Sequence, residues 1–274
     1  MNPREDNNLD IYLSGKKLYG DDFSEQDILA WYKDEEEAYA SLGAEDRENY
    51  EYVYNGINKY HGYSHIDNRN FSSALGFGSA YGDEFSPILN RISRITILDP
   101  SEKFVTSSIG NVPIDYRKPA PSGIIPAGNS EFDLFTCFGV LHHIPNVSFV
   151  ISELGRVMSA GGYGLIREPV TSMGDWRRPR RGLTSRERGI PHEIADNALR
   201  AAGFEIVYKE PCFFPPLKIL FDKFGGKGYY NNKRMCGLDH AFSKALRWNI
   251  SYRRDMILKK ISPTCYFWIV KKLS

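Results

Sequence analysis

Two adjacent histidines after a strand-like segment are the residues of this chain whose type and position point most directly to chemistry. Residues 132–137 are mostly apolar or aromatic and predict a buried parallel strand. Gly139 breaks this segment, His142 and His143 follow, and Pro145 marks a position where a helix can begin. Because ligands in open α/β sheets bind beyond the carboxyl ends of the strands, we interpret the histidine pair as part of a site.

Two further side chains could take part in acid–base chemistry with this pair. Glu168 ends the predicted strand 163–168, and His192 begins the next predicted helix. With His142 and His143 they are the four candidates for a base near an acceptor hydroxyl. Other roles stay open: one histidine could fix the loop through hydrogen bonds while the other packs beside a ligand, and Glu168 could pair with a nearby arginine.

A glycine-containing loop at residues 74–82 is a second candidate binding element. Its small residues would let the backbone approach a ligand at a helix N-terminus. Tyr81 stands where a nicotinamide-dinucleotide fingerprint needs its third glycine, and no G-K-[ST] follows, so neither that cofactor nor a P-loop is predicted. Asp99, at the end of the predicted strand 95–98, could accept both hydroxyls of a ribose, with a helix N-cap as the alternative.

Length and composition exclude several classes of protein. The chain has 274 residues, 42% hydrophobic and 25% charged, which is enough for one large domain with its own core. No secretory signal and no apolar run of membrane-spanning length is present, so we expect a cytoplasmic protein. The four cysteines are scattered without a CxxC pair, which predicts reduced thiols and no metal site.

The order of predicted elements indicates an α/β fold. Residues 24–60 predict two helices, the second over 45–60, that precede the first strand and pack across the ligand edge of the sheet. From a weak strand at 71–75 onward, strands alternate with helices, which predicts a doubly wound, mostly parallel sheet. We therefore divide the chain into an N-terminal helical cap, a core in two pieces and a helical insertion or lid, at residues 1–66, 67–210 with 263–274, and 211–262.

These motifs, in this order, resemble the class I S-adenosylmethionine-dependent methyltransferases of the small-molecule type. The resemblance rests on Gly76-x-Gly78-x-Ala80, on Asp99, and on the segments FDLFTCFGVLHHIPN and GRVMSAGGYGLI. It implies a Rossmann-like, doubly wound, seven-stranded sheet whose last strand, 264–270, inserts antiparallel. It also implies S-adenosyl-L-methionine as the cofactor.

The resemblance assigns cofactor contacts residue by residue. Gly76, Phe77, Gly78 and Ala80 would line the methionine part, and Asp99 would hold the ribose with Pro100 beside it. Phe138, Gly139 and Leu141 would border the sulfonium, and Ser122 would serve near the adenine. Two positions depart from the family pattern, because Ala74 replaces an acidic residue and Ala80 replaces a third glycine.

The segment 167–188 holds seven arginines against three acidic residues and begins at the same sheet edge. Arginine forks suit carboxylates and phosphates, so Arg167, Arg178 and Arg188, with Trp176, are the candidate residues for binding an anionic acceptor. The alternative is that these arginines pair with the N-terminal segment, whose first 51 residues carry 15 acidic and 5 basic side chains. Both alternatives stay open here.

The sequence thus predicts a methyltransferase that O-methylates a small polar acceptor such as a sugar, a nucleotide-linked sugar or an acidic metabolite. A non-catalytic cofactor-binding or partner-regulating protein of the same fold is the competing interpretation. Nucleic acid is disfavoured as the acceptor, because the N-terminal segment is acidic and the chain has no strong overall basic excess. The aromatic-rich insertion could cover the acceptor or form a homodimer surface.

Overall fold

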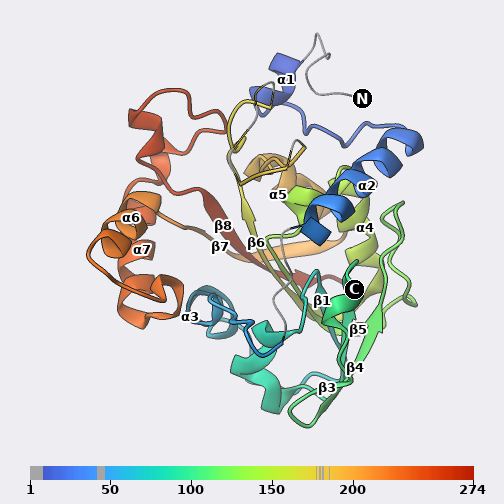
Figure 1. Cartoon of the computed structure of the whole chain (residues 1–274). Coiled ribbons are helices and arrows are strands. Elements are labelled where there is room, and N and C mark those ends of the chain that lie inside the picture. The colour runs from blue at the N-terminus through green and yellow to red at the C-terminus, as the bar shows by residue number, and fades with distance from the viewer. Residues whose placement is uncertain (1–8, 42–46, 177, 179, 181, 185) are drawn as a thin grey trace.

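An eight-stranded sheet with helices on both faces organises the computed structural model of the chain (Figure 1). The structure describes residues 9–41, 47–176, 178, 180, 182–184 and 186–274. The strands lie in the order β3-β4-β2-β1-β5-β6-β8-β7. Their bounds are Ala74–Phe77 (β1), Ile95–Leu98 (β2), Ser108–Ile109 (β3), Val112–Arg117 (β4), Phe132–Phe138 (β5), Met158–Pro169 (β6), Phe204–Cys212 (β7) and Cys265–Lys272 (β8).

The central strands are parallel, so their carboxyl ends form one edge. β1 pairs in parallel with β2 and β5, β2 with β4, and β5 with β6. β8 is antiparallel to both β6 and β7, which confirms the predicted antiparallel last strand. The two-residue strand β3, antiparallel to β4, adds an eighth strand to the seven that the resemblance implied.

The first strand begins three residues later than its sequence pattern predicts. The backbone N–H groups of Ser72 and Ser73 donate to the carboxylate of Asp133 instead of to a neighbouring strand. Phe71 makes only an isolated bridge to Ile92. A side-chain carboxylate has therefore taken the donors that would have extended β1.

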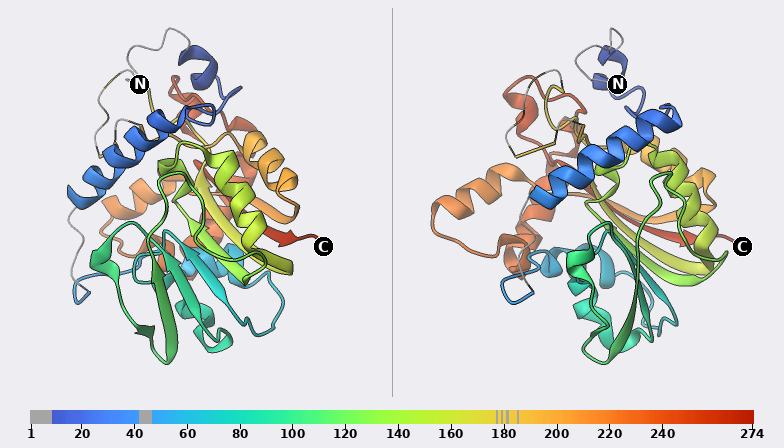
Figure 2. Two further views of the ribbon diagram at one scale, coloured as in Figure 1. Left: turned by 90° about the vertical axis from the view of Figure 1, so that its right-hand side faces the viewer. Right: turned by 45° about the vertical axis from the view of Figure 1, so that its right-hand side comes forward.

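Each face of the sheet is covered by its own helices, as both views in Figure 2 show. On one face α4 (Val147–Val157) and α5 (His192–Ala201) pack on side chains such as Phe135 and Val270. On the other face α3 (Asn55–Asn58), a π-helical turn (Lys59–Tyr63) and α7 (Lys233–Ala245) cover Leu134, Leu165 and Ile269. The sheet is thus buried on both sides, as its continuous apolar strands require.

The N-terminal segment lies over the carboxyl edge of the sheet. It contains α1 (Leu9–Leu13) and α2 (Glu25–Ser41), and α2 crosses the sheet where β5 and β6 end (Figure 2). Trp31 of α2 is fully buried and donates from Nε1 to the carbonyl of His143 at 2.7 Å. The second predicted helix was wrong over most of its length, because only α3 and the π-helical turn form; residues 42–46 lie outside the described part.

The segment between β7 and β8 is mainly helical. It contains α6 (Pro215–Lys223), α7 and three 3₁₀ turns at residues 229–231, 247–249 and 258–260. Another 3₁₀ turn, at residues 141–143, follows β5. Two further 3₁₀ segments, Asp83–Arg91 and Glu102–Phe104, follow β1 and β2. Within the described residues, no helix combines the length and apolar character needed to cross a bilayer.

Candidate functional site

Glu168, at the end of β6, fixes the loop that carries the paired histidines. Its Oε1 accepts the backbone N–H groups of Val140 and Leu141 at 2.7 and 2.9 Å. Its Oε2 lies 2.9 Å from Nδ1 of His142. Glu168 is 1% exposed, so both of its oxygens are used inside the protein. These contacts show that Glu168 positions the loop. Its charged partner is His142, and not the nearby arginine that the sequence left as an alternative.

His142 is held between two carboxylates. Its Nε2 lies 3.4 Å from Oε1 of Glu187, which comes from the loop between β6 and α5. Burial opposes the charged imidazolium, but the hydrogen bonds to Glu168 and Glu187 raise the pKa of His142 to about 9. A histidine that keeps its proton at neutral pH cannot accept one from an acceptor hydroxyl, so this geometry disfavours His142 as a general base.

His143 also lies near the carboxylate of Glu187. Its Nδ1 lies 3.0 Å from Oε2 of Glu35 in α2, and its Nε2 lies 3.8 Å from Oε1 of Glu187. His192 does not join this cluster, because its ring lies beside Lys209 and Tyr266, with Nδ1 3.2 Å from Nζ of Lys209. Burial, followed by the charge of Lys209, lowers the pKa of His192. The structure brings three of the four candidate bases together and leaves His192 apart.

Arg188 is a structural strut rather than an exposed anion clamp. Its side chain is fully buried. Nε donates to the carbonyl of Tyr19 at 2.9 Å. The two Nη atoms donate to the carbonyls of Leu141, His142, Ile144 and Pro145. All five guanidinium donors are therefore satisfied by backbone carbonyls, which leaves none for an acceptor.

The other described arginines of this loop differ in their contacts, and Arg180 donates to carbonyls of the loop itself, such as that of Glu187 at 2.6 Å. Arg186 pairs with Asp34 at 2.6 Å, and Thr184 donates to Glu35 at 2.6 Å. Arg178 is exposed, and residues 177, 179 and 181 lie outside the described part. Of the two alternatives for the arginine-rich segment, pairing with the acidic N-terminal helix is the one that these contacts support.

Trp176 is a buried packing residue. It is 3% exposed, donates from Nε1 to the carbonyl of Ser172 at 2.8 Å, and stacks on Tyr19 with ring centroids 5.1 Å apart. The ring belongs to a small core formed by the N-terminal segment and this loop. Because its face and its N–H are both used there, Trp176 serves packing in this structure and not acceptor binding.

Arg167, near the end of β6, is surrounded by aromatic rings. Nη1 donates to Oδ1 of Asn58 at 2.6 Å. The guanidinium carbon lies 4.5 Å from the ring centroid of Tyr54 and 5.0 Å from that of Phe213. The predicted sulfonium neighbour Phe138 borders the same group at 5.3 Å. Cation–π contacts with several rings hold this buried cation in place.

Glu84 is a buried carboxyl that sequence reasoning missed. It is 3% exposed, and its Oε1 accepts from the hydroxyls of Ser79, at 2.8 Å, and Thr136. Burial raises the pKa of Glu84 to about 7, against the opposing effects of these hydrogen bonds and of Arg167. It lies beside the glycine loop, and its only sequence signal is an acidic residue in the first turn after that loop.

The glycine loop has the backbone turn that the sequence predicts. Gly78 and Ala80 have φ values of 68° and 47°, and a Cβ on residue 78 would lie 2.6 Å from both methyl carbons of Val140. Phe77 is buried in β1, so a ligand at this loop would meet backbone atoms and not the Phe77 side chain. The loop therefore faces the segment that follows β5.

Asp99 lies at the end of β2 and contacts the same loop. Its Oδ2 accepts the N–H of Ala80 at 3.1 Å, and its Oδ1 accepts the N–H of Ser101 at 3.0 Å. Burial raises the pKa of Asp99, and these two bonds oppose the shift. Pro100 follows it on the loop. The Tyr116 hydroxyl is a further hydrogen-bond partner of this carboxylate, and Asp99 is 2% exposed. A carboxylate offers about four lone-pair sites, so some acceptor capacity remains for a ribose hydroxyl.

The remaining predicted cofactor residues border the loop after β5 or lie on the surface. Gly139 turns the chain with a φ of 74°, and Leu141 is buried behind it. Ser122 is exposed; its carbonyl accepts from Asn146 at 2.8 Å and its hydroxyl from the N–H of Ile124.

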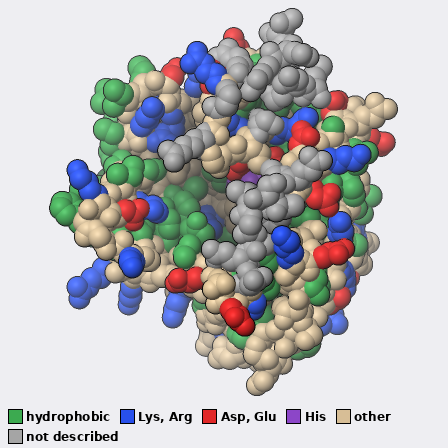
Figure 3. Space-filling view, viewed as in Figure 1, with side chains coloured by type: hydrophobic (Ala, Val, Ile, Leu, Met, Phe, Trp, Pro, Cys, Tyr) green, Lys and Arg blue, Asp and Glu red, His purple; other side chains and the backbone are tan. Residues whose placement is uncertain are grey.

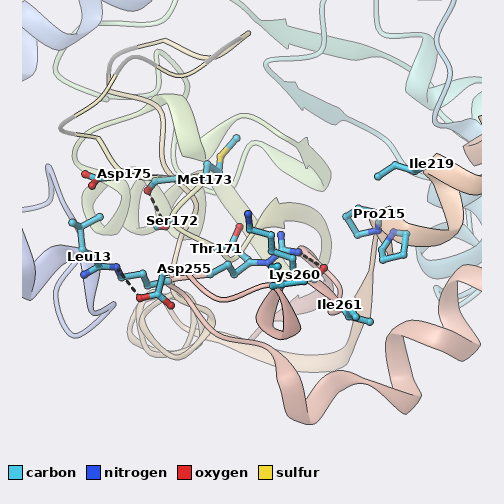
Figure 4. A pocket seen from close by; sticks show the side chains of 15 residues that line it. Leu13, Thr171, Ser172, Met173, Asp175, Pro215, Ile219, Asp255, Lys260 and Ile261 are labelled. Carbon is cyan, nitrogen blue, oxygen red and sulfur yellow. Dashed lines mark hydrogen bonds and ion pairs between the residues drawn. The ribbon is translucent and has the colours of Figure 1, made fainter.

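A cavity of about 670 Å³ opens beyond the carboxyl end of β6 (Figure 4). Figure 3 shows a hollow on this face with hydrophobic and basic side chains around it. The wall combines apolar residues with cations, of which Arg253 pairs with Asp255 at 3.5 Å. It is lined by Leu13, Thr171–Asp175, Pro215, Pro216, Ile219, Arg253–Asp255, Ile257, Lys260 and Ile261.

Residues 75–166 match the sequence model of the family described as "Methyltransferase domain". No curated protein matches the chain significantly. Solved structures share its fold: a putative methyltransferase from Listeria monocytogenes (12% identity, TM-score 0.55, covering 80% of this chain and 99% of that one) and one from Mesorhizobium loti (14%, 0.53, 79% and 98%). The Haloferax volcanii putative methyltransferase, solved in complex with the Trm112 activator, is similar over 90% of this chain and 98% of that chain (10% identity, TM-score 0.54).

The fold and the family match over residues 75–166 support a class I S-adenosylmethionine-dependent methyltransferase. Its methyltransferase domain includes residues 75–166, and S-adenosylmethionine is its cofactor. The chain's residues fit this group, because the turn at Gly78 leaves backbone partly exposed and the Asp99 carboxylate lies beside it at the end of β2.

Replacing Arg188 by Met should lower the free energy of unfolding by about 3 kcal/mol, because buried carbonyls lose their charged donor. Arg178→Met is the matched control, since it removes an exposed arginine from the same loop, and should change stability by no more than about 0.5 kcal/mol. Urea denaturation of both variants measures the difference. Equal effects would contradict the strut role of Arg188.

Glu84 should make stability fall as pH rises from about 4.5 to about 7. Its pKa is raised in the folded state, so the folded protein binds more protons in this window and loses stability as they leave. Glu84→Gln should remove this fall, gaining about 3 kcal/mol over wild type at pH 8. Exposed Glu102→Gln is the control, and free energies of unfolding that run parallel with pH in wild type and Glu84→Gln would contradict the assignment.

Proposed function

We propose that this methyltransferase O-methylates a small polar acceptor that carries an anionic group, such as a sugar derivative or an acidic metabolite. The observation that supports this proposal is the cavity beyond β6, whose wall combines apolar side chains with Lys260 and Arg254. Its volume of about 670 Å³ suits a small molecule. A lysine beside an apolar wall can orient a carboxylate or phosphate while the rest of the acceptor packs.

S-adenosylmethionine, when bound, supplies a methyl group on a positively charged sulfur. The chain's part is to hold the reactants in line, because such a displacement depends mainly on positioning. Asp99 and the backbone around Gly78 would hold the cofactor, and the segment 138–141 would border the reacting end. Because Glu168 and His142 engage each other, the proposal assigns no separate base to the reaction.

The arginine-rich loop supports a small acceptor over nucleic acid. Arg188 is buried and Arg186 pairs with Asp34, so neither adds to a surface that could follow a phosphate backbone.

The free thiols of all four buried cysteines support the proposed cytoplasmic location.

Calorimetric titration with S-adenosylmethionine tests the cofactor side. Wild type should bind one equivalent, and Asp99→Ala should weaken binding about tenfold or more, because two hydrogen bonds to a charged acceptor are lost. Exposed Asp115→Ala, on the neighbouring strand β4, is the matched control. Thermal melting of each variant separates lost binding from lost folding.

Methyl transfer to paired acceptors, with and without a carboxylate or phosphate, tests the acceptor side. Lys260→Ala should raise KM for the anionic member of each pair and leave the neutral member unchanged. Lys218→Ala on α6, paired with Asp222 and outside the cavity wall, is the control. Cofactor binding without turnover of any acceptor would overturn the enzymatic proposal in favour of a cofactor-binding or partner-regulating role.

A further inference from the structure

Three potential metal ligands converge beside the loop after β5. They are Nε2 of His142, Nε2 of His143 and Oε1 of Glu187, and all three atoms lie within 4.8 Å of one another. The carboxylate oxygen is 3.4 Å from the first nitrogen and 3.8 Å from the second. Tetrahedral zinc with bonds near 2.0–2.1 Å places neighbouring ligand atoms about 3.3 Å apart, so small adjustments would close these three around one ion.

Each imidazole is already oriented by a second carboxylate. Nδ1 of His142 lies 2.9 Å from Glu168, and Nδ1 of His143 lies 3.0 Å from Glu35. With Nδ1 directed to a carboxylate in each ring, Nε2 is the nitrogen that faces the shared point. This is the arrangement by which metal-binding histidines are held and made more basic.

Glu187 is anchored so that one of its oxygens is available. Its Oε2 accepts the N–H of Thr184 at 2.9 Å, and its own N–H donates to the hydroxyl of Thr184 at 3.1 Å. Oε1 then faces the two histidine nitrogens. The side chain of Glu187 is only 9% exposed, whereas that of His143 is 37% exposed, so the cluster has a solvent-facing side where water could complete the coordination.

The charges of the cluster favour a cation at its centre. Glu35, Glu168 and Glu187 bring three carboxylates to two imidazoles. The donors of the buried Arg188 are directed to backbone carbonyls, and Arg186 pairs with Asp34. A divalent ion would offset the excess of negative charge.

We propose that His142, His143 and Glu187 bind one divalent transition-metal ion of the zinc type, with Glu168 and Glu35 orienting the two histidines. The proposal departs from the expectation from the sequence that the chain holds no metal site. Because Glu35 lies on α2 and Glu187 on the arginine-rich loop, the ion fastens both segments to the loop after β5. The proposal is independent of which acceptor the enzyme uses.

Titration of the chelator-treated full chain with Zn²⁺ alone, followed by calorimetry, tests the site. Wild type should bind one ion per chain, and His143→Ala and Glu187→Ala should each weaken binding at least about 100-fold. Glu35→Gln, which removes only an orienting charge, should weaken it about 10-fold to 100-fold. His65→Ala removes an exposed imidazole elsewhere and should bind as wild type does.

Two further readouts separate a built site from adventitious binding. Zn²⁺ should raise the Tm of wild type and of His65→Ala but not of His143→Ala, and Co²⁺ should give the visible absorption of a tetrahedral site only where both histidines are present. Circular dichroism without metal confirms that each variant is folded. Failure of wild type to bind one ion, or equal affinities in wild type, His143→Ala and Glu187→Ala, would overturn the proposal.

Discussion

The buried guanidinium of Arg188 is the interaction on which the rest of the site depends. One side chain donates to carbonyls of the N-terminal segment and of the loop after β5, and so joins parts that are more than 120 residues apart in the chain. A buried charge is costly unless its donors are satisfied. Here backbone carbonyls satisfy all of them, which fixes the shape of the loop that borders both the cofactor edge and the histidine cluster.

Glu168 complements Arg188 by binding other groups of the same loop. Arg188 binds carbonyls of the loop, whereas Glu168 binds its N–H groups and one histidine. One buried cation therefore binds several carbonyls of the loop, and one buried anion binds two of its N–H groups. This division explains why residues that look catalytic in the sequence act on the position of the loop.

The core of the fold was predictable because its signals are local. Strands 95–98 and 132–138 are mostly apolar, and the order of strand, glycine loop and acidic strand end carries the resemblance to the methyltransferases. The predicted helix over 45–60 was wrong over most of its length, and the predicted start of β1 was also wrong. The start of β1 differs for a non-local reason. Asp133, some 60 residues away, takes the donors of Ser72 and Ser73.

The roles of individual site residues could not be predicted in the same way. Arg188 and Arg178 have the same side chain in the same loop, yet one is fully buried and the other is exposed. Glu84 and Glu187 belong to no sequence motif, and only their surroundings in the fold identify them as site residues. The sequence by itself determined the alternation of strands and helices along the chain, the cofactor edge and the position of the histidine pair, because hydrophobic pattern and turn residues act over short range. The tertiary structure alone decided which charges meet, because burial and pairing depend on contacts between distant segments.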